Sequence, residues 1–284
     1  MVLVEVKAFG VGIHDRYYVP GDMFFPGKAK FPYVVGSEGS GIISKVGSNV
    51  SNFVIGDEVL FTSGLTPQGG SWAQYVCLDA SVLIPLPEKL TFEQGAAIPI
   101  AADAAINSVR DLNLIDGEKL FIAGASGAIG TLVIQMAIAK GIQVVASASS
   151  KNHDYLRSLG VEMTVDYSDP EWQAQVHSLS NGGVDCALAI QPGTVKDSMS
   201  VVRVGGRVVS VSGGDGTQSE RNISIMQFEH SDDGVELVKD FVSHVANGSI
   251  KLVLEKVYSF NQALEALEKA ETRHARGKLV VRTD

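Results

Sequence analysis

The chain has 284 residues, of which 45% are hydrophobic and 19% charged, a composition typical of a folded protein with room for about two domains. Its 23 Lys and Arg against 32 Asp and Glu give a net charge of -9, which argues against nucleic acid as a partner, since its phosphates need a broad basic surface. The two cysteines, Cys77 and Cys186, can build neither a disulfide scaffold nor a multi-cysteine zinc lobe, so we expect a reducing, cytoplasmic setting.

The first hundred residues are predicted to form a small β-rich domain. Short β-branched runs, separated by Gly, Pro, Asn and Asp, lie at residues 2–8, 41–46, 58–61, 73–78 and 82–85. This spacing is typical of a barrel or a sandwich. Glu5 and Lys7 interrupt the first run, which therefore does not resemble a signal peptide. No apolar run reaches the roughly 18 residues of a membrane helix, so no membrane partner is predicted.

After a helical, Ala-rich stretch at residues 91–109, the pattern becomes an alternation of strands and helices. Predicted strands lie at 119–123, 142–149, 163–166, 184–190 and 206–211, and predicted helices at 131–140, 153–159, 170–179 and 195–202. Such alternation indicates parallel βαβ units and an α/β, doubly wound sheet. Residues 212–221 are the best candidate for a linker. The tail is mixed, with a helix at 235–245, a capping box of Ser259 and Gln262 before a second helix, and a strand at 279–281.

A glycine-rich loop between the first strand and helix of this alternation carries the main chemical signal. Its residues are Gly124, Ala125, Ser126, Gly127, Ala128, Ile129 and Gly130. Glycines at such a place allow a tight turn and close approach to a pyrophosphate, and the helix that follows offers free N–H groups. The pattern is GxxGxxG, with Ala125 where the commoner GxGxxG has its second glycine. We interpret the loop as a dinucleotide-binding site.

The end of the next strand indicates which dinucleotide is bound. An NAD-specific site usually has an Asp or Glu about 20 residues after the glycine loop, where it binds the ribose hydroxyls. This chain has Ser149, Ser150 and Lys151 at that place. Without a carboxylate, and with a lysine able to pair with a 2′-phosphate, NADPH is favoured. Alternatively, Lys151 only solvates the start of a helix.

Motifs in both halves of the chain resemble one known family. Residues 36–41, 46–50 and 53–59 fit the pattern GxEGxGxVxxVGxxVxxFxxGDxV of the medium-chain dehydrogenase/reductase family. Further matches, at residues 151–154, 159–160, 166–167, 205–209 and 275–278, are similar to its zinc-free NADPH:quinone oxidoreductase branch. The resemblance is co-linear over nearly the whole chain.

The resemblance implies a domain organisation and a partner. It implies a GroES-like catalytic domain at residues 1–100, a Rossmann NADP(H)-binding domain at 101–225, and a tail at 226–284 that partly returns to the catalytic domain. It also implies a homodimer formed through the Rossmann sheets. The expected substrate is a small molecule, either a quinone or a conjugated carbonyl compound.

The resemblance also locates the positions at which zinc-dependent members bind their metal. Those members have Cys and His where this chain has Gly12 and Ser37, and neither residue replaces a thiolate or an imidazole. We therefore expect no metal. His14 beside Asp15 suggests a metal site or a proton relay, but isolated histidines are also commonly structural.

Without zinc, the chemistry depends on hydride transfer from NADPH and on a hydrogen bond to the substrate oxygen. Tyr17 matches a tyrosine of the family segment DxY and is the candidate catalytic residue, although it is also compatible with simple packing. The resemblance further implies that Lys151 and Tyr167 lie by the adenosine phosphate, that a C-terminal arginine, Arg273 or Arg276, lies near the cofactor, and that Gln191 contacts it.

Several departures from the family bear on activity. Gly12 and Ala104 stand where the family commonly has Asn and Thr, and residues 189–192 differ from the acid and glycine of many relatives. The family also opens with further residues before its first strand and is longer between 213 and 235, so an incompletely closed catalytic domain is expected. These departures leave open an NADP(H)-binding paralogue with little catalysis, acting as a redox sensor or an interaction protein. A zinc-free alcohol or polyketide-type enoyl reductase is a third alternative.

Overall fold

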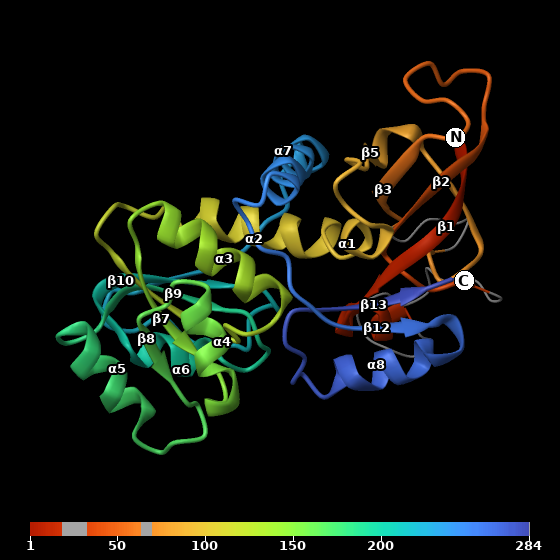
Figure 1. The fold of residues 1–284 in the computed structure, drawn as a ribbon. Helices are drawn as coiled ribbons and strands as arrows, with labels where there is room; N and C mark the ends of the chain where they lie inside the picture. The colour runs from red at the N-terminus through yellow and green to blue at the C-terminus, as the bar shows by residue number, and fades with distance from the viewer. Residues whose placement is uncertain (19–32, 64–69, 284) are drawn as a thin grey trace. The chain divides into compact units, whose positions relative to one another are not determined.

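The computed structural model describes residues 1–18, 33–63 and 70–283, and the chain separates into two units (Figure 1). The first unit comprises Met1–Ala102 and Asp233–Asp284, and the second comprises Asp103–Asp232. The first is built on an antiparallel sheet and the second on a parallel one. The predicted α/β fold class is therefore confirmed, with a parallel-sheet unit inserted into a β-rich one.

The sheet of the first unit is organised around its longest strand, β1. Its strands are β1 (Val2–Val11), β2 (Glu38–Val46), β3 (Glu58–Thr62), β4 (Tyr75–Leu78), β5 (Leu83–Pro85), β12 (Leu254–Ser259) and β13 (Lys278–Arg282). The order is β12-β13-β1-β2-β3-β5, and β4 also pairs with β1. Gly41 lets β2 cross β1 closely, because a Cβ atom there would lie 2.0 Å from the carbonyl oxygen of Glu5. The C-terminal strand β13 thus completes a sheet that the N-terminal strand begins.

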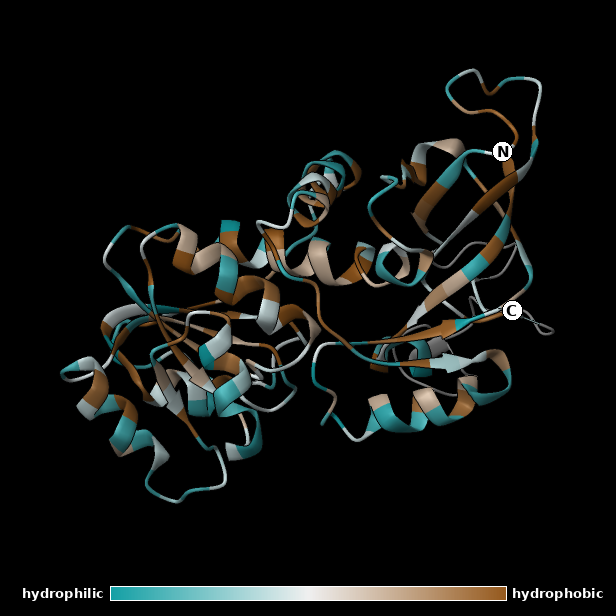
Figure 2. Cartoon of the chain, in the orientation of Figure 1, coloured by the Kyte–Doolittle hydropathy of each residue, from teal (hydrophilic) through white to brown (hydrophobic). Residues whose placement is uncertain are grey.

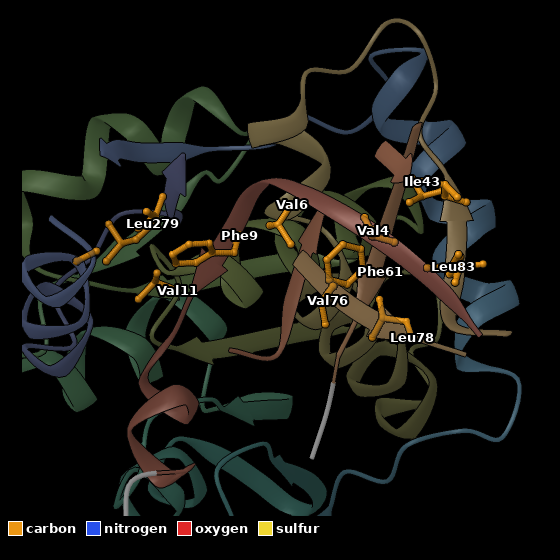
Figure 3. Packing of buried hydrophobic residues seen from close by; sticks show 14 of the residues in the cluster. Val4, Val6, Phe9, Val11, Ile43, Phe61, Val76, Leu78, Leu83 and Leu279 are labelled. Atoms are coloured by element: carbon orange, nitrogen blue, oxygen red, sulfur yellow. The ribbon is translucent and has the colours of Figure 1, made fainter. Parts of the chain in front are cut away.

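Alternating apolar residues of β1 form the core of this unit. Val2, Val4 and Val6 are buried, whereas the residues between them are partly exposed. Figure 3 shows Val4 and Val6 close to Phe61 of β3. The ring of Phe9 stacks on Trp72 at a centroid distance of 5.3 Å. Period-two burial explains why this segment forms a strand.

Short helices complete the first unit. Among the described residues they are 3-10 helices at Ile13–Tyr18, Ala80–Val82 and Phe260–Gln262 and the α-helices α1 (Phe92–Ala96), α7 (Gly234–Ala246) and α8 (Ala263–Glu271). α1 begins at a capping box, in which the backbone N–H of Thr91 donates to Gln94 Oε1 at 2.9 Å and the N–H of Gln94 donates to Thr91 Oγ1 at 3.3 Å. The predicted capping box at Ser259 and Gln262 is confirmed, and it precedes α8. α2 (Pro99–Leu112) begins in the first unit and ends in the second.

The second unit is a parallel sheet with the strand order β11-β10-β9-β6-β7-β8. Its strands are β6 (Lys119–Ala123), β7 (Gln143–Ser147), β8 (Met163–Val165), β9 (Val184–Ala189), β10 (Val202–Ser210) and β11 (Ser224–Gln227). The helices between them are α3 (Ala128–Ala139), α4 (His153–Ser158), α5 (Trp172–Ser180) and α6 (Val195–Ser200). The central strands are hydrophobic along most of their length, whereas α5 presents polar residues as well (Figure 2). β6 has neighbours on both sides, β7 and β9, so the winding direction reverses at its carboxyl end.

Most predicted elements of this unit are confirmed, and the differences have local causes. α3 begins at Ala128, three residues before the predicted start, because the turn of the glycine loop ends at Gly127. The predicted helix at 195–202 ends at Ser200, since the β-branched run that follows joins β10. Residues 212–221, the linker candidate, form the loop between β10 and β11 inside the second unit. Among the described residues, no helix has the length and hydropathy needed to cross a membrane.

Candidate functional site

The glycine loop lies where β6 ends and α3 begins, at the reversal point of the second sheet. Gly124 has a φ of +89°, a conformation that other residues rarely adopt. Gly130 lies in the first turn of α3, where a Cβ atom would lie 2.6 Å from the carbonyl oxygens of Gly124 and Ala125. Both positions therefore require glycine, one for the turn and one for the close approach of helix and strand.

The N-terminus of α3 is free to bind an anion. Its N-cap, Gly127, provides no side-chain cap, and its first turn contains no acidic residue. The first backbone N–H that bonds back to the cap belongs to Thr131, at 3.0 Å from the oxygen of Gly127. The N–H groups of residues 128–130 thus lack helical acceptors, and the helix dipole adds positive potential. A Cβ atom at Gly127 would meet only the Gly124 oxygen, at 3.5 Å, so the loop leaves space beside it. This cradle fits a pyrophosphate.

Gln191 reaches the loop from the neighbouring strand β9. β9 pairs with β6 in the register Ala123↔Ala189, and Gln191 follows two residues later. A Cβ atom on Gly124 would lie 3.0 Å from Gln191 Cγ and 3.4 Å from its Nε2. The structure therefore places the predicted residue Gln191 beside the glycine loop, with a polar amide close to Gly124.

Asn152, which the sequence analysis missed, joins the glycine loop to the end of β7. It is buried, and its Nδ2 donates to Ser126 Oγ at 3.2 Å and to Ser149 Oγ at 3.3 Å. Ser149 is half-buried and is the N-cap of the short 3-10 turn Ser150–Asn152, and Lys151 is exposed within that turn. The predicted residues Ser126, Ser149 and Lys151 are thus brought together. The only signal for Asn152 was its place directly after Lys151.

A carboxylate that the sequence analysis did not assign supports this turn from β8. Asp166 accepts hydrogen bonds from the Ser150 N–H at 2.8 Å, the Ser168 N–H at 2.9 Å and the Ser168 hydroxyl at 2.6 Å. The Ser168 hydroxyl above all, together with these N–H groups, lowers the pKa of Asp166 to about 2. Asp166 is therefore ionised at neutral pH, next to exposed Tyr167. The turn that contains Lys151 thus has the carboxylate of Asp166 beside it. No carboxylate lies at the end of β7 itself, where NAD-specific sites usually have one.

The two positions at which zinc-dependent relatives bind metal have other contacts here. The Gly12 N–H donates to Asp15 Oδ2 at 2.9 Å, and the Ser37 hydroxyl donates to Asp15 Oδ1 at 3.0 Å. Asp15 and Ser37 are both buried. Across the described ranges, no group of three or more His, Cys, Asp or Glu side chains could hold a metal ion. The donor set at Gly12 and Ser37 does not fit zinc, which prefers imidazole, thiolate and carboxylate ligands.

A buried ion pair lies next to this cluster. The Glu38 side chain is 0% exposed and Lys278 is 5% exposed. Glu38 Oε1 pairs with Lys278 Nζ, and Oε2 accepts a hydrogen bond from the Ile100 N–H at 2.8 Å. Glu38 therefore links β2, β13 and the start of α2.

The remaining predicted residues belong to the first unit. The backbone of Tyr17 lies in the 3-10 helix Ile13–Tyr18, and its side chain lies outside the described part of the structure. Arg273 is exposed after α8 with a φ of 58°, and nearby Arg276 donates its backbone N–H to Glu255. The glycine loop, Ser149, Lys151, Tyr167 and Gln191 belong to the second unit. Ala104 is buried in the part of α2 that belongs to the second unit.

Comparisons with known proteins match residues of both units. A family model described as an alcohol dehydrogenase GroES-like domain matches residues 1–88, and one described as a zinc-binding dehydrogenase matches residues 159–281. The chain is 28% identical to a zinc-type alcohol dehydrogenase-like protein of Schizosaccharomyces pombe, over 100% of this chain and 91% of that protein. It is 27% identical to the chloroplastic NADPH-dependent alkenal/one oxidoreductase of Arabidopsis thaliana, over 99% and 71%.

A solved structure shares the fold over the whole chain. The quinone oxidoreductase of Coxiella burnetii is 26% identical and has a TM-score of 0.90, covering 100% of this chain and 90% of that one. The GroES-like model matches the N-terminal part of the chain and the dehydrogenase model matches the C-terminal part, which is the order expected for the family. The fold of the solved structure is shared over the whole chain. The chain therefore belongs to the medium-chain dehydrogenase/reductase superfamily of zinc-type alcohol dehydrogenase-like proteins, in its quinone oxidoreductase branch.

Proposed function

We propose that the chain is a zinc-independent reductase that transfers a hydride from NADPH to a quinone or an α,β-unsaturated carbonyl compound. Its superfamily makes it an oxidoreductase. The observation that carries the proposal is the uncapped N-terminus of α3, joined through Asn152 to Ser149 and the turn that presents Lys151. The substrate class follows from relatives whose names specify alkenals or quinones.

Each predicted cofactor residue has a role in this proposal. The N–H groups of residues 128–130 hold the pyrophosphate, and the hydroxyl of Ser149 and the ammonium of Lys151 bind the 2′-phosphate. Tyr167 lies beside the adenosine and Gln191 reaches the loop from β9, while Arg273 is a proposed cofactor contact on the family resemblance alone. The negative charge of Asp166 repels the 2′-phosphate, but hydrogen bonds from Ser150 and Ser168 already stabilise the Asp166 carboxylate. We therefore expect Lys151 to decide between NADPH and NADH.

Zinc independence follows from the contacts at Gly12 and Ser37. Glycine has no ligand atom, and the Ser37 hydroxyl donates to Asp15. Polarisation of the substrate oxygen must then come from hydrogen-bond donors of the protein. Tyr17 is the proposed donor from the segment that follows Asp15. NADPH, when bound, supplies the hydride.

The function is tested by following NADPH consumption with a panel of quinones and conjugated enals and enones. Protein dialysed against EDTA, with its metal content measured, should retain full activity. Turnover of no compound in the panel would contradict the function. Loss of activity on chelation, restored by zinc, would contradict zinc independence.

Cofactor choice is tested separately by binding. Lys151→Ala should weaken NADPH binding by about 10-fold or more, because it removes a charge-assisted contact, and should leave NADH binding nearly unchanged. Lys140→Ala is the matched control, since Lys140 is an exposed lysine at the other end of α3. Equal weakening of both cofactors, or no effect, would refute the assignment of Lys151 to the 2′-phosphate.

The second candidate function is an NADP(H)-binding protein with little catalysis, acting as a redox sensor or an interaction protein. Gly12 and Ala104 favour it, because neither offers a polar side chain where the family commonly has one. Tight NADPH binding without turnover of any quinone, enal or enone would support this candidate over the reductase.

We also propose a homodimer formed through the edge of the parallel sheet. β11 is its outer strand, and Ser224, Met226 and Gln227 on it are exposed. An unpaired strand edge of this kind can pair with the same strand of a second copy. Light scattering after size exclusion should give the mass of a dimer, and Gln227→Pro, which removes a backbone donor from the outer edge of β11, should give a monomer.

A further inference from the structure

The inference concerns the side chain of Asn152, which makes its contacts outside its own helix. Asn152 is the N-cap of α4, yet its side chain makes no capping hydrogen bond to that helix. Asparagine is favoured at such a position because it usually caps the first turn. Here the residue is 8% exposed, and its Nδ2 donates instead to Ser126 Oγ at 3.2 Å and to Ser149 Oγ at 3.3 Å. Asn152 thus contacts the glycine loop and the end of β7 in place of its own helix.

The fold brings the two serine hydroxyls to one edge of the second sheet. β6 and β7 are neighbouring parallel strands, and Ser126 follows the end of β6 as Ser149 follows the end of β7. The Ala125 N–H donates to the Ser147 oxygen at 3.1 Å, and the Asn152 N–H donates to the Ser149 oxygen at 2.9 Å. These backbone hydrogen bonds hold the two loops side by side at the carboxyl ends of the strands, where open α/β sheets bind dinucleotides.

The direction of the two side-chain hydrogen bonds determines where the hydroxyl protons lie. An amide nitrogen is a donor only, so the serine oxygen accepts at both contacts. Each hydroxyl therefore keeps its own proton. Within the described parts of the chain, neither Ser126 Oγ nor Ser149 Oγ donates this proton to another group. Both protons are thus directed away from Asn152 and free for an acceptor such as a phosphate oxygen.

The charged groups near the Ser149 hydroxyl are compatible with an anion at this place. Lys151 is exposed in the 3-10 turn that Ser149 begins. Asp166 accepts hydrogen bonds from the Ser150 N–H at 2.8 Å and from the Ser168 hydroxyl at 2.6 Å, and these donors offset its negative charge. The turn therefore offers one phosphate both a hydroxyl donor and an ammonium group.

We propose that Asn152 is a positioning residue for NADPH, which directs the Ser126 hydroxyl to the pyrophosphate and the Ser149 hydroxyl to the 2′-phosphate. The proposal rests on the function proposed above and links its two phosphate sites through one amide group. Asn152 acts through the two serines and does not itself contact the cofactor. A change at Asn152 therefore affects the binding of both phosphate groups, whereas a change at either serine affects one.

Fragments of the cofactor separate the two sites in a calorimetric titration. ADP-ribose carries the pyrophosphate without the 2′-phosphate, and the preference for 2′,5′-ADP over 5′-AMP isolates the 2′-phosphate. Ser126→Ala should weaken ADP-ribose binding about 10-fold and Ser149→Ala should lower the preference about 10-fold, because each removes a hydrogen bond to a charged group. Asn152→Leu keeps a similar branched shape without the amide donors, and it should produce both effects. Unchanged binding of all three fragments by Asn152→Leu would overturn the proposal.

Double variants test whether Asn152 acts through the serines. Asn152→Leu/Ser149→Ala should lower the preference for 2′,5′-ADP no further than Ser149→Ala alone, and Asn152→Leu/Ser126→Ala should bind ADP-ribose as Ser126→Ala does. Additive losses in both pairs would overturn the proposal. Asn107→Leu is the matched control, because Asn107 is a buried asparagine of the same unit whose Nδ2 donates to the Asp103 oxygen at 2.9 Å. This control should leave fragment binding unchanged.

Asn152→Ala provides a second variant in case Asn152→Leu fails to fold, and it should weaken the same two interactions. The wild-type protein separates failure of this proposal from failure of the proposed cofactor. Wild-type protein that binds 2′,5′-ADP no more tightly than 5′-AMP would contradict both the choice of NADPH and the role of Asn152. Wild-type protein with a clear preference for 2′,5′-ADP, which Asn152→Leu or Asn152→Ala retains in full, would overturn the role of Asn152 and leave the choice of NADPH intact.

Discussion

Lys278→Met is expected to destabilise the first unit strongly, because it leaves the Glu38 carboxylate buried without its cation. Glu38 is 0% exposed, and after the substitution it keeps the hydrogen bond from the Ile100 N–H at 2.8 Å. Methionine retains most of the length and volume of the lysine stem, so little of the loss comes from a cavity. The change thus isolates the charge.

The expected size follows from the burial of both partners. Removing one member of a buried ion pair costs about 3–5 kcal/mol, because the other remains charged in a medium that solvates it poorly. Replacing both members is often nearly neutral, so the double variant Glu38→Gln/Lys278→Met should lose about 1 kcal/mol or less. The double variant should therefore be more stable than Lys278→Met alone.

Urea unfolding followed by tryptophan fluorescence measures this difference. Trp72 lies in the first unit and stacks on Phe9, whereas Trp172 lies in the second unit and stacks on Phe121. In a Trp172→Phe background, Trp72 therefore reports on the first unit alone. A loss below about 1 kcal/mol for Lys278→Met, as for an exposed ion pair, would refute the reasoning. So would a double variant less stable than Lys278→Met.

Three further predictions concern the second unit. Gly130→Ala should weaken NADPH binding at least 10-fold in a fluorescence titration, because its Cβ meets backbone oxygens at 2.6 Å, whereas Gly214→Ala, with open space around it, should not. The hydrogen bond with Asp103 raises the pKa of His230. The stabilisation from this contact is therefore fully present below the usual histidine pKa and is lost as the pH rises through the raised value. In thermal melts between pH 6 and 9, Asp103→Asn should remove this pH dependence. The pKa of Asp166 is lowered from 3.8 to about 2, so the stability that its carboxylate contributes is present above pH 3.8 and is lost as the pH falls toward 2. Asp166→Asn should lack this loss of stability in acid unfolding. Acid unfolding that is the same in Asp166→Asn and the wild-type protein would contradict the prediction.

The parts of the site that the sequence predicts depend on local patterns. The glycine loop directly follows β6 (Lys119–Ala123) and directly precedes α3. The apolar run, the glycines and the helix are therefore adjacent in the sequence and together predict the dinucleotide-binding motif. Ser149 and Lys151 were found from their distance along the chain. In each case a few neighbouring residues determine the structure.

The parts that the sequence does not predict depend on contacts between distant segments. Asp166 supports Ser150 only because β8 pairs with β7 in the register Ser147↔Val165. β12, whose Glu255 and Lys256 interrupt any apolar pattern, forms because it pairs with β13. Asn152 likewise reaches the glycine loop only because β7 pairs with β6. Register and close approach are properties of the folded chain, so alternation of residue types does not reveal them.

The central element of the proposed function is the passage of a hydride from NADPH to carbon in a protein without zinc. Metal-free protein should be incubated with a conjugated enone and NADPH deuterated at C4, prepared separately in each of its two stereochemical forms. We expect that one of the two forms yields a saturated product with a single deuterium on the β-carbon. A product without deuterium from either form, or no product until zinc is added, would contradict it.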